Sequence, residues 1–266
     1  MAFSAKDIQE LRQVIGAGIL DCRRALEATD GDVEAAKQWL REQGLASAGK
    51  RAERESAEGA VAAVVVGNGT PTGAIVELRC ETDFVAKSPD FVALVDKLSA
   101  ALASDGEEAL TSLAPEVQEL NMSLKENISI GRTARFAAAA GNVLDSYLHI
   151  QAERGKIAVL VELANGSPEM AHDIAIHISF AAPQYLSRED VPADVIETER
   201  KTIEAMARNE GKSEAAIEKI IEGRLRAFFK DVCLLEQGFV RDDKQSVEAY
   251  LGEAKVVRYA RVGIGS

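Results

Sequence analysis

The feature that most constrains the fold is a plan of strands and a capped helix that occurs twice along the chain. Val76-Glu77-Leu78 is repeated as Val161-Glu162-Leu163, and Ser88-Pro89-Asp90 returns as Ser167-Pro168-Glu169. In each copy the serine can cap a helix whose first position is the proline. A unit used twice in this way predicts two α+β subdomains, each a small antiparallel sheet covered by helices on one side.

Each copy contains three stretches of strand composition, rich in branched aliphatic residues and bounded by turn residues. They cover 59–66, 74–78 and 128–136 in the first copy, and 145–150, 157–163 and 256–262 in the second. After the capping serine, apolar residues recur at helical spacing, such as Phe91, Val95 and Leu98 in the first copy. This spacing predicts one buried helix face for each sheet.

The amino-terminal residues predict three short helices. Ser4 with Asp7 is a variant of the capping box. Gly16-Ala17-Gly18 interrupts the first helix, Asp30-Gly31 ends the second, and Gly44 is expected to end the third. Three helices of this size predict a small bundle of the ubiquitin-associated type.

The second copy is interrupted between its helix and its last strand, from about residue 187 to about residue 230. Apolar residues at helical spacing lie on both sides of a turn at 209–213, with Ile203 before it and Ile217 and Ile221 after it. This pattern predicts an antiparallel helical hairpin inserted into the second subdomain.

These patterns define an α+β fold and divide the 266 residues into four parts. Residues 1–46 form the ubiquitin-associated-like three-helix domain, and 47–57 form a linker whose small and charged residues are compatible with a helix. Residues 58–142 form the first core subdomain, and 143–266 form the second, with the hairpin inserted at about 187–230.

The two copies differ in the segment that joins strand to helix. The step from Leu78 to Ser88 is ten positions and that from Leu163 to Ser167 is four, so the first copy has six extra residues. Phe84 lies in this extra segment, which we expect to be a loop, with acidic neighbours. We predict that Phe84 is an exposed wedge that inserts into a partner's pocket. The alternative is that it folds back as a local hydrophobic staple.

Composition excludes several classes of protein. The formal net charge is −12, and so acidic a chain repels polyphosphate, so no direct nucleic-acid partner is expected. The longest apolar run, 60–66, is too short to cross a bilayer, and the start lacks the features of a signal peptide, so no membrane partner is expected. The three cysteines are widely spaced, which favours reduced thiols in a cytoplasmic protein.

No credible catalytic or metal-binding constellation is present. His172 and His177 are five positions apart, so they cannot share a metal from one helix face, and we expect neither metal nor cofactor. Gly211-Lys212-Ser213 lacks the upstream glycine of a phosphate-binding loop. Cys80 lies near acidic residues but has no histidine close in sequence. These absences favour a binding protein.

Five segments, in order, resemble the elongation factor Ts family over essentially the whole chain. They are Gly16-Ala17-Gly18-Ile19-Leu20 with the residues through Leu26, Thr82-Asp83-Phe84-Val85-Ala86, 173–177 with Pro183, 222–224, and 234–240. A few positions depart from the family's pattern. Ile15 stands where a threonine is usual, Ile19 and Leu20 where methionines are common, and Gly238 where a proline is usual.

The resemblance implies a guanine nucleotide exchange factor for elongation factor Tu in translation elongation, which is not an enzyme. The residues implied at the partner contact are Gly16, Ala17, Gly18, Ile19, Leu20, Thr82, Asp83, Phe84, Val85, Ala86 and His177. Phe84, with Asp83, would enter a pocket beside the switch region and shift the elements that hold Mg²⁺. His177 would press toward the phosphate-binding loop.

Two other functions are compatible with parts of the pattern. A non-catalytic interaction adaptor would explain the helices and the acidity, and would bind a partner without faster nucleotide release. A thiol-dependent enzyme would use Cys80. The oligomeric state is open: both a homodimer and a heterotetramer with elongation factor Tu fit the sequence.

Overall fold

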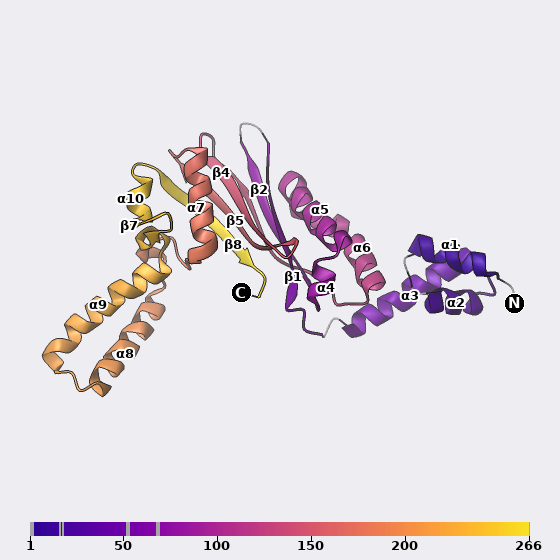
Figure 1. The fold of residues 1–266 in the computed structure, drawn as a ribbon, viewed down its shortest axis with the longest axis horizontal. Coiled ribbons are helices and arrows are strands. Elements are labelled where there is room, and N and C mark those ends of the chain that lie inside the picture. Colours follow the sequence, from indigo (N-terminus) through magenta and orange to yellow (C-terminus); the bar gives the residue numbers. More distant parts are fainter. Residues whose placement is uncertain (1–2, 16, 18, 52–53, 68–69, 266) are drawn as a thin grey trace.

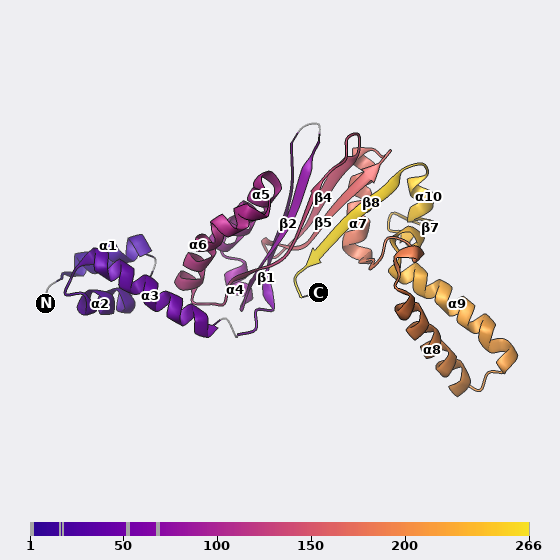
Figure 2. The ribbon, with the colours of Figure 1, turned by 180° about the vertical axis from the view of Figure 1, so that it is seen from behind.

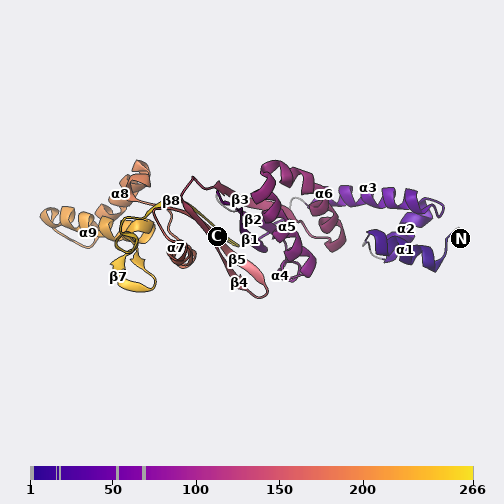
Figure 3. The same cartoon turned by 90° about the horizontal axis from the view of Figure 1, so that it is seen from above.

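The computed structural model describes residues 3–15, 17, 19–51, 54–67 and 70–265. The molecule is elongated, with a helical bundle at the amino-terminal end and a helical hairpin at the other (Figure 1). Between them lie two three-stranded antiparallel sheets. Viewed from above, the bundle, the two sheets with their helices, and the hairpin follow one another along the long axis (Figure 3). The predicted α+β fold class is confirmed.

The amino-terminal bundle consists of α1 (Ala5–Ile15), α2 (Ile19–Ala28) and α3 (Val33–Arg51). The capping box is confirmed, because the Ser4 amide donates to Asp7 Oδ2 at 2.6 Å and the Asp7 amide donates to Ser4 Oγ at 3.4 Å. The bundle has its own apolar core, which includes Leu11, Cys22, Leu26 and Leu40.

The prediction that Gly44 ends the third helix is wrong. Helix α3 continues through this glycine to Arg51, so the first part of the segment 47–57 is helical. A glycine inside a helix costs about 1 kcal/mol relative to alanine, which the surrounding alanines, lysine, arginine and leucine can offset because they favour helix. A glycine stops a helix only where the backbone turns left-handed.

The first sheet has the strand order β1-β2-β3, with β2 in the centre. Its strands are β1 (Glu58–Val66), β2 (Thr72–Cys80) and β3 (Ser129–Ala137). Helices α5 (Pro89–Asp105) and α6 (Glu107–Leu124) cover one face, and Leu78, Phe91 and Leu98 lie in the core between sheet and helices. The sequence analysis did not predict α6, although Leu113, Val117 and Leu120 have helical spacing.

The second sheet repeats this arrangement with the order β4-β5-β8. Its strands are β4 (Val143–Gln151), β5 (Arg154–Ala164) and β8 (Lys255–Gly263). Helix α7 (Pro168–Ala181) covers its outer face. Ser167 caps α7 as predicted, with its Oγ accepting from the Met170 amide at 3.2 Å. In the first copy Ser88 occupies the same position, but its hydroxyl donates instead to the Val85 carbonyl at 2.8 Å.

The inner faces of the two sheets pack against each other, which the sequence analysis did not foresee. Their shared core includes Val61, Ile75, Leu144 and Leu160. The backbones approach closely here: a Cβ on Gly155 would lie 2.0 Å from the Val61 carbonyl oxygen. The core is therefore a sandwich of two sheets with helices on both outer faces (Figures 1 and 2).

A buried glutamate lies at the same position of each central strand. Arg258 Nε donates to Glu162 Oε2 at 2.8 Å, and its Nη2 donates to the Ala137 carbonyl at 2.7 Å. In the first copy Arg132 likewise holds Glu77 at 3.1 Å and donates to the Gly263 carbonyl at 2.5 Å. Each arginine thus pairs with the acid of its own sheet and donates a hydrogen bond to the third strand of the other sheet, so two arginine–carbonyl hydrogen bonds cross the sandwich.

The hairpin consists of α8 (Ala193–Asn209) and α9 (Glu214–Val232), preceded by the short η1 (Arg188–Asp190). The two helices pack through Ile203, Ala207, Ile217 and Ile221. The remaining elements were not predicted individually and close the second core before β8. They are η2 (Leu234–Glu236), β6 (Gly238–Phe239), β7 (Asp242–Ser246) and α10 (Val247–Leu251).

Candidate functional site

The extra segment of the first copy forms one turn of helix, α4 (Asp83–Ala86), and not the predicted loop. Thr82 is its N-cap, and its hydroxyl accepts from the Val85 amide at 3.4 Å. Threonine is a favoured N-cap residue, and an aspartate in the first turn complements the helix dipole. Thr82 is therefore a helix-start signal in the sequence, and the prediction of a loop did not take it into account.

Helix α4 buries one side and exposes the other. Ala86 is fully buried and Val85 packs against the first core, whereas the Phe84 side chain is 82% exposed. An aromatic ring this exposed has not folded back onto its own chain, so the hydrophobic-staple alternative is excluded. The exposure expected of a wedge is confirmed, and its insertion into a partner stays a prediction.

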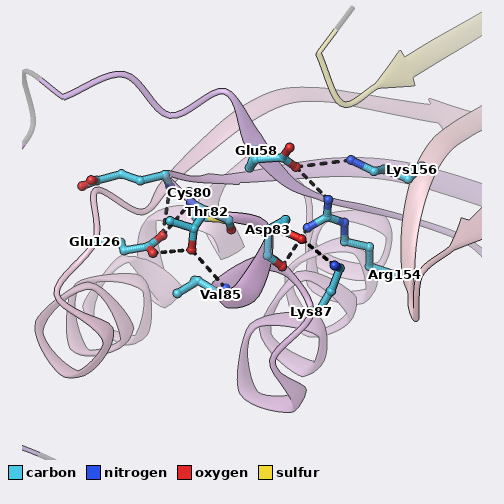
Figure 4. Close-up of polar contacts among 10 residues, drawn as sticks. Glu58, Cys80, Thr82, Asp83, Val85, Lys87, Glu126, Arg154 and Lys156 are labelled. Atoms are coloured by element: carbon cyan, nitrogen blue, oxygen red, sulfur yellow. Dashed lines mark hydrogen bonds and ion pairs between the residues drawn. The ribbon is translucent and has the colours of Figure 1, made fainter.

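Glu126 anchors α4 from the segment between α6 and β3 (Figure 4). Its Oε2 accepts from the backbone amides of Glu81 and Thr82, both at 3.0 Å, and its Oε1 accepts from Thr82 Oγ1 at 2.5 Å. These bonds fix the entry to α4 before Phe84 is reached. The sequence analysis missed Glu126 because it lies 44 positions from Thr82, and no local pattern joins the two.

The other side of α4 carries compensating charges. Lys87 Nζ pairs with Asp83 Oδ2 at 2.5 Å, one helical turn away. This hydrogen bond lowers the pKa of the Asp83 carboxyl below its ordinary value. Arg154, at the start of β5, donates from Nη1 to the Asp83 carbonyl at 3.2 Å. Contacts from the first subdomain and from the second sheet therefore hold the segment that bears Phe84.

Cys80 does not fit the thiol-enzyme alternative. Its side chain is fully buried, and Sγ donates to the Thr82 carbonyl at 3.2 Å. Burial, with the nearby Glu126 carboxylate as a smaller cause, raises the pKa of the thiol to about 12. Because the thiolate is the nucleophile, a thiol that stays protonated at neutral pH is a poor one. Its observed contact is structural.

His177 lies inside the second core and is 1% exposed. The Val240 amide donates to Nδ1 at 3.2 Å, so Nε2 carries the proton and donates to Gln237 Oε1 at 3.0 Å. Burial lowers the pKa of the imidazole, in spite of the bond to Gln237. In this structure His177 joins α7 to the segment 237–240, and it does not lie on a surface with Phe84.

Two exposed apolar residues near the end of the β4–β5 hairpin and on α7 were not predicted. Ile150 is 64% exposed and Phe180 is 58% exposed. The ring of the half-buried His149 meets that of Phe180 edge-on at 5.6 Å between centroids. The same hairpin carries Arg154, which contacts α4, so Ile150 lies at the end of the second sheet that makes this contact. The sequence signal that could have pointed to Ile150 is that it is an apolar residue placed directly before a turn.

The amino-terminal bundle presents a second apolar surface. Ile19 and Leu20 are exposed at the start of α2, and Val14 is exposed on α1. Ala17 packs partly into the bundle core. The predicted contact residues Gly16 and Gly18 lie outside the described residues.

An exposed aromatic ring on an anchored helix, with further exposed apolar residues on a small bundle, is typical of a protein that acts by binding another protein. Among the described residues, no cluster of three or more His, Cys, Asp or Glu side chains is arranged to hold a metal ion. None of the helices in the described parts of the chain combines the length and apolar character needed to cross a membrane.

Comparison with known proteins agrees with this class. The family model described as Elongation factor TS matches residues 81–266. The elongation factor Ts of Acidothermus cellulolyticus is 43% identical over 277 residues, covering 99% of this chain and 98% of the relative. Those of Clavibacter michiganensis subsp. michiganensis and Streptomyces coelicolor are 43% and 41% identical, each covering 99% of both chains. The chain belongs to the elongation factor Ts family, a family of translation elongation factors.

Proposed function

We propose that the protein is a guanine nucleotide exchange factor in translation elongation, which binds elongation factor Tu in its GDP form and promotes GDP release so that GTP can bind. Family membership supports the partner and the class of activity. The observation that carries the proposal is Phe84, 82% exposed on a helix that is anchored from the first subdomain and from the second sheet. An adaptor would not require so rigid a mount for one exposed aromatic ring.

In the proposed mechanism Phe84 enters a pocket beside the switch region of the GTPase, with Asp83 next to it. Insertion displaces the elements that hold Mg²⁺, and binding of the nucleotide phosphates depends strongly on that ion. Factor and nucleotide then bind with negative coupling, so each weakens the other by the same factor. A coupling of about 4 kcal/mol would lower nucleotide affinity about a thousandfold. No covalent bond is made or broken, so the factor is not an enzyme.

Two further predicted contacts have different support in the structure. Ile19 and Leu20 are exposed and suited to docking on the GTPase domain. His177 is buried behind Gln237 and Val240, so its pressing on the phosphate-binding loop would require the segment 237–240 to move. In the proposal His177 therefore acts by keeping α7 and that segment together.

The test is release of a fluorescent GDP analogue from elongation factor Tu, followed by stopped flow with increasing concentrations of the protein. We expect the release rate to rise to a plateau far above the spontaneous rate. Binding to Tu without any increase in the release rate would contradict exchange and favour an adaptor. Failure to bind active Tu at all would contradict both.

Leu20→Asp should separate docking from exchange. A carboxylate in place of an exposed apolar contact removes buried area and adds a desolvation cost. We expect the concentration of factor for half-maximal release to rise about tenfold, the equivalent of ~1.4 kcal/mol, with the plateau rate unchanged. Met206→Asp, an exposed apolar position on α8 of the hairpin, is the matched control. A lower plateau with an unchanged half-maximal concentration would contradict a docking role for Leu20.

A further inference from the structure

Arg154 is a buried cation with an unusual set of contacts. Its side chain is 3% exposed, and charged side chains are seldom so buried unless they are paired. Nη2 donates to Glu58 Oε2 of β1 at 2.7 Å, and Nη1 donates to the backbone carbonyl of Asp83 at 3.2 Å. Nε is buried and has no hydrogen-bond partner among the described residues. An apolar side chain of similar size often serves stability as well as such a group.

The contact with Asp83 falls on a backbone carbonyl that takes part in the internal hydrogen bonding of α4. The Asp83 carbonyl also accepts from the Lys87 amide at 3.2 Å, which closes the single turn of this helix. One turn is not stable alone, because helix nucleation is unfavourable, so contacts from outside decide its orientation. Glu126 supplies them from the first subdomain and Arg154 from the second sheet (Figure 4).

The backbone that carries Arg154 is itself fixed. The next residue, Gly155, lies so close to β1 that a Cβ there would approach the Val61 carbonyl oxygen to 2.0 Å. The start of β5 is therefore packed directly against β1 of the first sheet. Glu58, which accepts from Nη2, limits the guanidinium further. Arg154 thus connects the second sheet to the single helical turn that bears Phe84.

We propose that Arg154 is a positioning residue for nucleotide exchange, which ties α4 to the second sheet and presents Phe84 in the orientation that enters the partner's pocket. This inference rests on the proposed function of Phe84. Its effect falls on the insertion step more than on initial docking, because it concerns orientation and not contact area. The second subdomain then contributes to exchange through a residue that never touches the partner.

Arg154→Met tests this by removing the donors and keeping the bulk. Phe84 can insert only in the right orientation, and loss of that orientation is costly. We therefore expect the plateau rate of GDP-analogue release to fall about tenfold. The half-maximal concentration should change less than about twofold, because docking contacts remain. Arg154→Lys keeps one donor and should restore part of the rate. Lys156→Met is the matched control, since Lys156 also pairs with Glu58, at 3.3 Å, and makes no hydrogen bond or ion pair with α4 in the described part of the chain.

Combination with Phe84→Ala shows whether Arg154 acts through Phe84. If it does, adding Arg154→Met to Phe84→Ala lowers the plateau no further than about twofold, because the two changes remove one shared interaction. If the plateau rate of the double variant falls by the product of the two single losses, the inference is wrong. It is also wrong if the plateau rate of Arg154→Met equals that of the unchanged chain.

Amide hydrogen exchange on the protein alone separates this inference from the proposed function. The amides of Ala86, Lys87 and Ser88 make the internal hydrogen bonds of α4 and its C-terminal turn. We expect them to exchange about tenfold faster in Arg154→Met and to be unchanged in Lys156→Met, because local opening sets the protection. Unchanged protection in Arg154→Met would overturn the positioning role. A chain that fails to accelerate release yet shows this loss of protection would refute the exchange function and leave the anchor in place.

Discussion

Phe84→Ala is expected to lower the plateau rate of GDP release from elongation factor Tu about thirtyfold, the equivalent of ~2 kcal/mol. Phe84 is 82% exposed, so truncation removes little packing within the described parts of its own chain. Truncation therefore removes the group that we propose enters the partner and leaves the anchoring contacts of α4 intact. A central aromatic anchor of this kind commonly carries a large share of an interface's energy.

The controls for Phe84→Ala follow from its exposure. Loss of a side chain that contacts solvent should change the free energy of unfolding by no more than about 0.5 kcal/mol. Val257→Ala, at another exposed apolar position on β8, should leave both release rate and stability unchanged. A Phe84→Ala protein that unfolds normally and exchanges nucleotide as fast as the unchanged chain would show that the wedge assignment is wrong.

Glu162→Ala is expected to lower the free energy of unfolding by about 3 kcal/mol, because it removes a buried carboxylate that accepts three hydrogen bonds, and hydrogen bonds to charged groups are stronger than those between neutral groups. The Glu162 side chain is 1% exposed, whereas that of Arg258 is 43% exposed. Besides the bond from Arg258, the carboxylate accepts from the Ala139 amide at 2.9 Å and from Asn142 Nδ2 at 2.7 Å. After the substitution all three donors lose this acceptor and must bind water instead.

Far-UV circular dichroism during chemical unfolding is the measurement for Glu162→Ala, because the single tryptophan, Trp39, lies in the bundle and does not report on the sheets. Glu253→Ala, an exposed glutamate before β8, is the matched control and should change stability by less than about 0.5 kcal/mol. A double-mutant cycle with Arg258→Met isolates the pair. A Glu162→Ala protein as stable as the control would contradict the cross-sheet role.

The buried carboxylates of Glu162 and Glu77 also predict that the stability of the protein depends on pH. Burial alone would raise the pKa of Glu162, but the hydrogen bonds from Asn142, Ala139 and Arg258 outweigh it and lower the pKa. Glu77 behaves alike, with the bonds from Arg132 opposing burial. The unfolded chain therefore binds protons more readily than the folded one. The stability that Glu77 and Glu162 contribute to the folded state is present above the ordinary glutamate pKa of 4.5. It is lost as the pH falls below that value.

Local patterns predicted most of the secondary structure. The caps at Ser4 and Ser167, the strands of both sheets and the hairpin turn near Gly211 depend on neighbours a few positions away. The errors arose where local signals competed. Gly44 was given more weight than the helix formers around it, and the length of the extra segment suggested a loop where Thr82 begins a helical turn.

The candidate site was predictable only in part. An aromatic residue in a segment that one copy has and the other lacks pointed to Phe84, and its exposure is confirmed. The residues that hold it were not predictable. Glu126 and Arg154 reach α4 across 44 and 71 positions of sequence. His177, assigned a partner contact from resemblance, lies in the core because Gln237 and Val240 close over it.

The sequence by itself determined the duplication, the amino-terminal bundle and the helical hairpin, and it singled out Phe84 in the extra segment of the first copy. Each of these features is encoded in the spacing of residues along the chain. Only the tertiary structure decided that the two sheets pack face to face, that Arg132 and Arg258 donate hydrogen bonds from one sheet to the other, and that the second sheet anchors the helix of Phe84. The physical reason is that periodicity shows which face of an element is apolar, but not which other face it will meet.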